Sequence, residues 1–188
     1  EEAFVALARR FFRWIGPATA AQFQAFAGLG VKAAKAATAP LGLVPVLADS
    51  PLLLLPDDLE ALRAFTPPAE PVYRLVASVD GLALLRRDLA PLIDPADAPR
   101  LGAGNGLQDL PSHAIVDRGR LVGLWEYDPA EGAIAWVSFV PPTAALRAEV
   151  ERTAAMIRDQ LGDARAFSLD SPDSRRPRIA ALRAQAGA

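Results

Sequence analysis

The chain has no cysteine, a single histidine and no long run of apolar residues. Without cysteine it can form neither a disulfide nor a thiolate metal site, and one histidine cannot build a zinc site alone. The longest apolar stretch, Leu52–Pro56, is far shorter than the roughly 20 residues of a transmembrane helix. Residues 1–15 show no secretory pattern. We therefore expect a cytoplasmic protein with no metal, no other cofactor and no membrane contact.

The chain does have 188 residues, 52% of them hydrophobic, which is enough for one large or two small domains. Its net charge of −2 is unevenly spread. Residues 1–40 carry five basic and two acidic side chains, residues 41–170 carry 11 and 19, and residues 171–188 carry four and one. Contacts to phosphates supply most non-specific affinity for DNA. The balance therefore argues against a strong stand-alone DNA binder and allows a modest one.

The first 66 residues follow the pattern of a winged helix-turn-helix. Apolar side chains spaced as on one helical face predict a helix over residues 4–15. Thr19 and Gln22 form a capping-box pattern, in which hydroxyl and amide satisfy free backbone N–H groups. This pattern predicts the start of a second helix over residues 20–27.

The winged pattern continues through residues 28–55. Gly28-Leu29-Gly30 turns the chain into a third helix, which should end before Pro40 because proline disfavours helical geometry in the preceding residue. Two apolar runs, 43–47 and 52–55, are separated by turn residues and predict a β-hairpin wing. A module of this kind usually contacts DNA.

A proline-rich stretch, residues 66–71, is a stiff connector, so we place a domain boundary there and a second domain over residues 72–188. A helix that Thr143 caps and Gly162 ends should cover the sheet of this second domain. A basic tail then closes the chain. The predicted strands are 72–79, 114–117, 121–127 and 133–140, of which the last three form an antiparallel meander, with a further strand over 166–170.

Several short sequence motifs are spread over most of residues 5–140, and their order along the chain is more informative than any one of them. They are Leu7–Phe12 leading into Gly16–Thr19, Leu84–Asp88 followed by Ile93–Pro95, Gly104–Gly106, and Val116–Trp125. Together they resemble the winged-helix crosslink-repair DNA glycosylase family of the AlkZ/YcaQ type. The resemblance implies an α+β fold of tandem winged helices on a C-terminal β-barrel. This chain would supply the last winged helix and the barrel-like domain.

The resemblance also implies where the chemistry lies. In that family a Gln-aliphatic-Gln or Gln-aliphatic-Asp motif in the amino-terminal part serves catalysis, and nothing in this chain corresponds to that part. Gln22-Phe23-Gln24 mimics the motif, but residues i and i+2 of a helix point to different sides. The catalytic residues are therefore unknown. Because the sequence does not begin with methionine, an upstream segment with further winged-helix domains could belong to it.

The candidate DNA contacts are basic side chains. Lys32 and Lys35 lie three apart on the expected recognition helix, among alanines that offer no hydrogen bonds to bases, so contact with the DNA backbone of a duplex fits better than sequence readout. Each arginine candidate also has a structural interpretation: an internal ion pair, a polar turn or a disordered terminus. These arginines are Arg86 and Arg87, Arg118 and Arg120, and Arg175 and Arg176.

Three other residues attract attention but favour structural roles. His113 titrates near neutral pH, yet it has no nucleophile motif beside it. Trp125 and Trp136 lie in expected strands, where large aromatic residues usually pack in cores.

The first hypothesis is thus a DNA-repair glycosylase-like protein, or its C-terminal part, that holds damaged duplex DNA weakly for hydrolysis of an N-glycosidic bond. The alternatives are a non-catalytic winged-helix regulator and a protein-interaction module. The first hypothesis depends on the arginines forming a positive surface rather than being bound by carboxylates.

Overall fold

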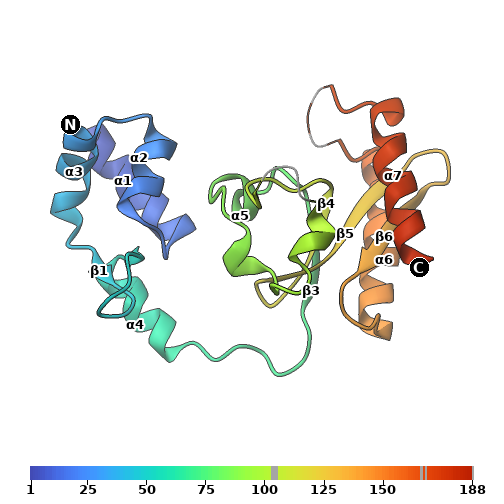
Figure 1. Cartoon of the computed structure of the whole chain (residues 1–188), viewed down its shortest axis with the longest axis horizontal. Helices are drawn as coiled ribbons and strands as arrows, with labels where there is room; N and C mark the ends of the chain where they lie inside the picture. The colour runs from blue at the N-terminus through green and yellow to red at the C-terminus, as the bar shows by residue number, and fades with distance from the viewer. Residues whose placement is uncertain (103–105, 166, 168, 188) are drawn as a thin grey trace. The chain divides into compact units, whose positions relative to one another are not determined.

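The computed structural model describes residues 1–102, 106–165, 167 and 169–187 (Figure 1). The chain divides into two compact units, Glu1–Pro67 and Pro68–Ala188. Helices and antiparallel sheets occur in both. Among the described residues, no helix is both long and apolar enough to cross a membrane.

Unit 1 is a small helical cluster followed by a short hairpin. Its core contains Phe11, Phe12 and Phe23, and the ring centroid of Phe11 lies 5.3 Å from that of Phe12 and 5.5 Å from that of Phe23. The elements are α1 (Glu2–Ile15), α2 (Ala20–Ala27), α3 (Val31–Thr38), the 3-10 turn η1 (Ala39–Leu41), β1 (Val44–Pro45), β2 (Leu53–Leu54) and α4 (Pro56–Ala64).

The expected capping box is present. The Thr19 hydroxyl accepts a hydrogen bond from the Gln22 N–H at 3.1 Å, and the Gln22 side chain accepts one from the Thr19 N–H at 2.7 Å. The second helix has the predicted bounds, and the third ends at Thr38, ahead of Pro40. The expected hairpin is short: Val44 pairs with Leu54.

Unit 2 contains a four-stranded antiparallel sheet with the order β3-β4-β5-β6. Its neighbouring strands pair throughout as antiparallel ladders, with a bulge between Ile115 and Val116. The strands are β3 (Tyr73–Val76), β4 (His113–Asp117), β5 (Arg120–Asp128) and β6 (Ala133–Ser138).

The expected closed barrel is not found among the residues that the structure describes, and the sheet is open. The described residues between β3 and β4 add no strand to the sheet. They form short helical turns whose apolar side chains, such as Leu89, Ile93 and Leu101, pack with Val116 and Leu124 on one face of the sheet. The turns are α5 (Gly81–Leu84), η2 (Ala90–Leu92) and η3 (Ala98–Leu101). The sheet has four strands, and the turns cover one of its faces, so within the described chain no further strand is available to join its two edges into a barrel.

Helix α6 (Ala144–Met156), capped by Thr143, covers the other face of the sheet, which confirms the expected covering helix. Its Leu146 and Val150 pack with Ile115 and Trp125. A π-helical turn, η4 (Ile157–Leu161), follows and ends at Gly162.

The expected basic tail is instead a 15-residue helix, α7 (Pro172–Ala186), that packs on β5 and β6 (Figure 1). The Ser171 hydroxyl accepts a hydrogen bond from the Ser174 N–H and so caps the start of α7. Leu182 joins the core beside the sheet. Two residues of the expected strand over 166–170, Ala166 and Ser168, lie outside the described residues.

Candidate functional site

The two lysines of α3 are exposed. Ala34 and Ala37 lie on the opposite side of the helix and pack in the core, where they are 6% and 3% exposed. Neither Lys32 nor Lys35 forms an ion pair or a side-chain hydrogen bond with another described residue. This face of α3 therefore offers two uncompensated positive charges.

Helix α1 adds two basic residues that the sequence did not single out as a site. Arg9 and Arg10 are exposed and form no ion pair within the described parts of the chain, whereas Arg13 lies 3.0 Å from Asp58. A signal was present, because both arginines lie off the apolar face of their helix. Helices α1 and α3 thus carry four exposed cations that form no ion pair with another described residue.

The arginines of unit 2 are arranged differently, because five of the six candidates pair with aspartates. The shortest N–O distances are 3.4 Å for Arg87 and Asp109, 3.0 Å for Arg118 and Asp117, 3.3 Å for Arg120 and Asp94, 2.8 Å for Arg175 and Asp163, and 2.9 Å for Arg176 and Asp173. Five of the six arginines are therefore bound by carboxylates, so the first hypothesis cannot rest on a free positive surface in unit 2, and a DNA contact by these residues stays a prediction. A charge count could not reveal this pairing.

These pairs differ in strength. Arg87, Arg120 and Arg176 are at least 61% exposed in their side chains, and exposed pairs contribute only about 0–1 kcal/mol. Such pairs can open when a phosphate competes for the guanidinium. Arg86 is half-buried, and desolvation by burial lowers the pKa of its guanidinium although Asp88 acts to raise it.

Arg118 is held firmly at the β4–β5 turn. Its guanidinium donates to the Asp117 carboxylate and to the carbonyl oxygens of Pro68 and Ala69, at 3.2 Å and 2.9 Å. Its backbone adopts φ +48°, a left-handed conformation that is uncommon outside glycine. The side chain thus fastens the start of unit 2 to the turn.

Arg175 has no exposed surface and cannot be the tail contact that the sequence suggested. It is 0% exposed and donates to Asp163 at 2.8 Å and to the Ala164 carbonyl oxygen at 2.8 Å. Hydrogen bonds to the Arg175 and Arg165 side chains lower the pKa of Asp163, although desolvation, the largest single effect, acts to raise it. Because the tail is a helix packed on the sheet, this arginine faces inwards.

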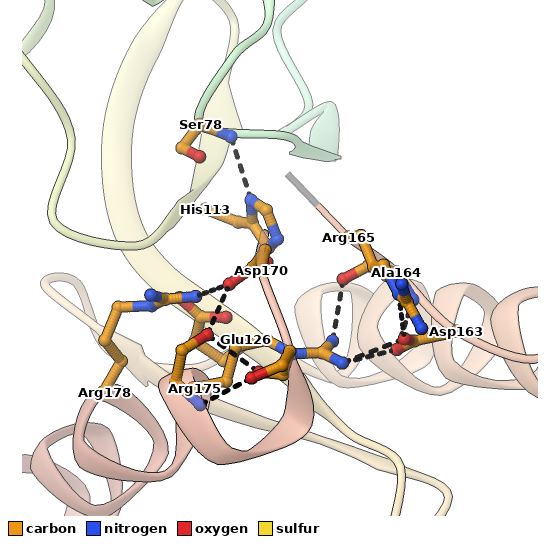
Figure 2. Close-up of polar contacts among 11 residues, drawn as sticks. Ser78, His113, Glu126, Asp163, Ala164, Arg165, Asp170, Arg175 and Arg178 are labelled. Carbon is orange, nitrogen blue, oxygen red and sulfur yellow. Dashed lines mark hydrogen bonds and ion pairs between the residues drawn. The ribbon is translucent and has the colours of Figure 1, made fainter. Parts of the chain in front are cut away.

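A buried ionic cluster joins α7 to the sheet (Figure 2). Arg178 donates to Glu126 of β5 at 2.6 Å and to Asp170 at 2.7 Å, and these carboxylates are 1% and 0% exposed. The second oxygen of Glu126, Oε2, is buried and has no hydrogen-bond partner among the described residues.

His113 lies beside this cluster (Figure 2). Its Nδ1 accepts from the Ser78 N–H at 2.9 Å, and its ring centroid is 4.5 Å from that of Trp125. Desolvation by burial lowers the pKa of His113, against the raising effect of Glu126 and Asp170. The neutral ring therefore carries its proton on Nε2, and the contacts of its other nitrogen favour a structural role.

Trp125 and Trp136 also have contacts that matter for the fold. The Trp125 indole N–H donates to the Ala114 carbonyl oxygen at 3.1 Å, within the core. Trp136 is partly exposed at the edge strand β6. In the described parts of the chain, no group of three or more His, Asp or Glu side chains could hold a metal ion.

Comparison with known proteins gives two findings. A family model described as DNA glycosylase AlkZ-like matches residues 1–159. The solved structure of the Streptomyces sahachiroi DNA glycosylase AlkZ is similar in fold, with a TM-score of 0.65 at 20% sequence identity. That match covers 87% of this chain and 44% of the Streptomyces chain, so this chain spans less than half of that protein. No sequence among the curated proteins matches.

Proposed function

The chain belongs to the AlkZ-like DNA glycosylase family, and on that premise we propose that it holds duplex DNA in a DNA-repair glycosylase while an N-glycosidic bond is hydrolysed. The family match supports the class of activity. The greater length of the Streptomyces relative supports a larger functional protein. A cytoplasmic location, with the DNA on which it acts, is part of this proposal.

In this proposal α1, α2, α3 and the β1–β2 hairpin act as a winged helix, with α3 as its recognition helix. Three short helices in succession, the glycine turn before α3 and the following hairpin support this assignment. Because alanine fills most of α3, the helix has few side chains that can read base edges. Contact is therefore with the phosphate backbone, and binding by this chain is weak.

The single observation that carries the DNA-binding part is the charge of α3. Lys32 and Lys35 are exposed and unpaired with any described residue, whereas most arginine candidates of unit 2 have aspartate partners. Phosphate binding releases counterions only where a cation is available to neutralise the phosphate. We therefore assign the first contacts to α3 and the exchangeable Arg87, Arg120 and Arg176 to a secondary role.

We place the hydrolytic chemistry outside these 188 residues. The Gln22 side chain, the nearest mimic of the family's catalytic motif, is occupied by the α2 cap. Release of a modified base by this chain alone would overturn this part of the proposal.

The test measures binding to a duplex, with and without an alkylated base, at two salt concentrations. Each phosphate contact contributes a slope of about −0.9 in the logarithm of affinity against the logarithm of salt. The double variant Lys32→Gln and Lys35→Gln should therefore bind more weakly and lose up to about 1.8 of that slope. Arg63→Gln, an exposed cation on α4, is the matched control and should change little.

The alternatives give different results in the same experiment. A regulator would prefer one DNA sequence over others, and an interaction module would bind neither duplex. Absence of binding even at low salt would exclude both DNA-binding hypotheses.

A further inference from the structure

A pocket of about 410 Å³ lies at β6, the last strand in the order of the described sheet. The side chains that line it come from four elements or their flanks. The polar and aromatic ones are Arg100 of η3, Trp136 and Ser138 of β6, Arg147 of α6 and Gln185 of α7. No Asp or Glu side chain belongs to the described lining, so the pocket favours an anion.

Arg147 supplies an available positive charge. Its side chain is exposed and forms no ion pair or hydrogen bond with other described residues, and its guanidinium carbon lies 6.0 Å from the Trp136 ring centroid. An arginine beside an aromatic ring can bind a phosphate through its planar donors. The Trp136 indole is partly exposed and supplies an apolar aromatic wall.

Arg100 supplies a second, more ordered guanidinium. It lies 4.3 Å above the Phe139 ring and donates to the Ser138 carbonyl oxygen at 3.2 Å. Its distance to Asp97 is 3.6 Å, longer than a strong ion pair. Its remaining donors can therefore meet a ligand without the side chain first losing much conformational freedom.

The α7 wall of the pocket is held by ion pairs to the sheet. Arg178 binds Glu126, and Arg183 lies 2.9 Å from Asp128, so the two carboxylates of β5 fasten the helix that carries Gln185 (Figure 2 shows the first pair). The Gln185 side chain has no hydrogen-bond partner among the described residues. The pocket thus combines fixed walls with unused polar groups.

We propose that this pocket binds one unpaired nucleotide of DNA, with its phosphate on Arg147 and Arg100 and its base against Trp136. Base stacking on an aromatic side chain tolerates every base, and arginine suits phosphate. The volume falls within the range of about 300–1,000 Å³ that small-ligand pockets occupy. The choice of DNA over a free nucleotide rests on the proposed function.

The experiment titrates the full chain with thymidine monophosphate, unphosphorylated thymidine and a single-stranded thymidine tetranucleotide, by calorimetry and tryptophan fluorescence. We expect the tetranucleotide to bind most tightly, thymidine to bind at least tenfold more weakly than its monophosphate, and fluorescence to be quenched. Arg147→Gln should weaken tetranucleotide binding at least tenfold. Trp136→Phe should remove the quenching while part of the calorimetric signal remains. Arg158→Gln, an exposed arginine of η4 outside the pocket, is the matched control and should bind as the unmodified chain does.

Two results overturn the proposal: no binding of either phosphorylated probe, or equal binding by the Arg147 variant and the control. Tighter binding of the monophosphate than of the tetranucleotide would overturn DNA as the source. The Lys32 and Lys35 double variant separates this site from the proposed function. It should weaken duplex binding and keep tetranucleotide binding, whereas failure of the pocket alone would leave duplex binding intact.

Discussion

Arg178 of α7 and Glu126 of β5 are 52 residues apart in sequence, and their side chains meet at 2.6 Å inside unit 2. Arg178 also donates to Asp170, so one guanidinium serves two buried carboxylates (Figure 2). These contacts fix α7, the segment that the sequence analysis expected to be a basic tail, against the sheet as a helix. They also explain why the positive charge at the end of the chain is only partly available to a ligand.

Arg178→Ala should lower the free energy of unfolding by about 3 kcal/mol. Removing one partner of a buried ion pair leaves the other charge buried and uncompensated. Urea unfolding followed by circular dichroism measures the effect. Arg176→Ala is the control, because its partner Asp173 is 79% exposed, and it should cost less than about 0.5 kcal/mol. Equal losses for the two variants would contradict a buried role for Arg178.

His113 should make the stability of unit 2 depend on pH. Burial lowers its folded-state pKa below the unfolded value of about 6.5, against the opposing effect of Glu126 and Asp170, while Arg178 and Arg175 lower it further. Its stabilising contribution is therefore complete above about pH 6.5 and is lost as the pH falls through the lower folded pKa. The slope can reach about 1.4 kcal/mol per pH unit, because a single proton is involved.

The variant His113→Asn isolates this effect, since its amide oxygen can still accept from the Ser78 N–H. Unfolding measured between pH 7 and pH 5 should show a shallower decline for this variant than for the unmodified chain. Protonation of His113 removes the acceptor at Nδ1, so the protection of the Ser78 amide against hydrogen exchange, measured relative to an unprotected amide at the same pH, should decrease as the pH falls. An unchanged pH profile in the variant would show that other groups control the decline.

Local signals in the sequence predict unit 1 well. The capping box formed by Thr19 and Gln22 involves residues three apart, and the apolar spacing of α1 is likewise local, so neither depends on the rest of the fold. The barrel prediction failed because closure would need further strands, and the described residues between β3 and β4 form helical turns instead. The leucines there, such as Leu89, lack the alternation of a strand, and they fill one face of the sheet from helical turns.

The candidate site was harder to predict for a related reason. Arg87 and Asp109 are 22 residues apart, and Arg175 and Asp163 are 12 apart, so a count of charges cannot identify them as partners. Tertiary structure decides which cations remain unpaired. The exposure of Lys32 is easier to predict, because helical periodicity alone places it on the opposite face of α3 from the buried alanines.

Gly123→Ala should destabilise unit 2 by about 1–3 kcal/mol. An added Cβ would lie 2.4 Å from the Val137 carbonyl oxygen of β6 and 3.1 Å from Ile115, so β5 and β6 must move apart. Thermal unfolding measures the change. Gly81→Ala, where the nearest atom is a Leu85 side-chain carbon at an ordinary 3.5 Å, is the control in the same unit. A cost no larger than that of the control would show that the strands adapt freely.

Arg118→Asn should release the connector while leaving the hairpin folded. Asparagine tolerates the left-handed backbone at this position, where φ is +48°, better than arginine does. The substitution also removes the donors to the Pro68 and Ala69 carbonyl oxygens. We therefore expect faster proteolysis at residues 68–71, with little change in the melting temperature of unit 2.

Arg120→Asn tests whether this effect belongs to Arg118 or to any charge at the turn. Arg120 adjoins the same turn, but its side chain is 64% exposed and its one ion-pair partner among the described residues is the half-exposed Asp94, so the connector should stay protected in this variant. Val72 still donates to Asp117 at 2.7 Å in both variants and keeps β3 in register. Loss of protection that spreads into β3 would mean that Arg118 stabilises the sheet itself. Protection of residues 68–71 equal to that of the unmodified chain would mean that the carbonyl contacts of Arg118 do not hold the connector.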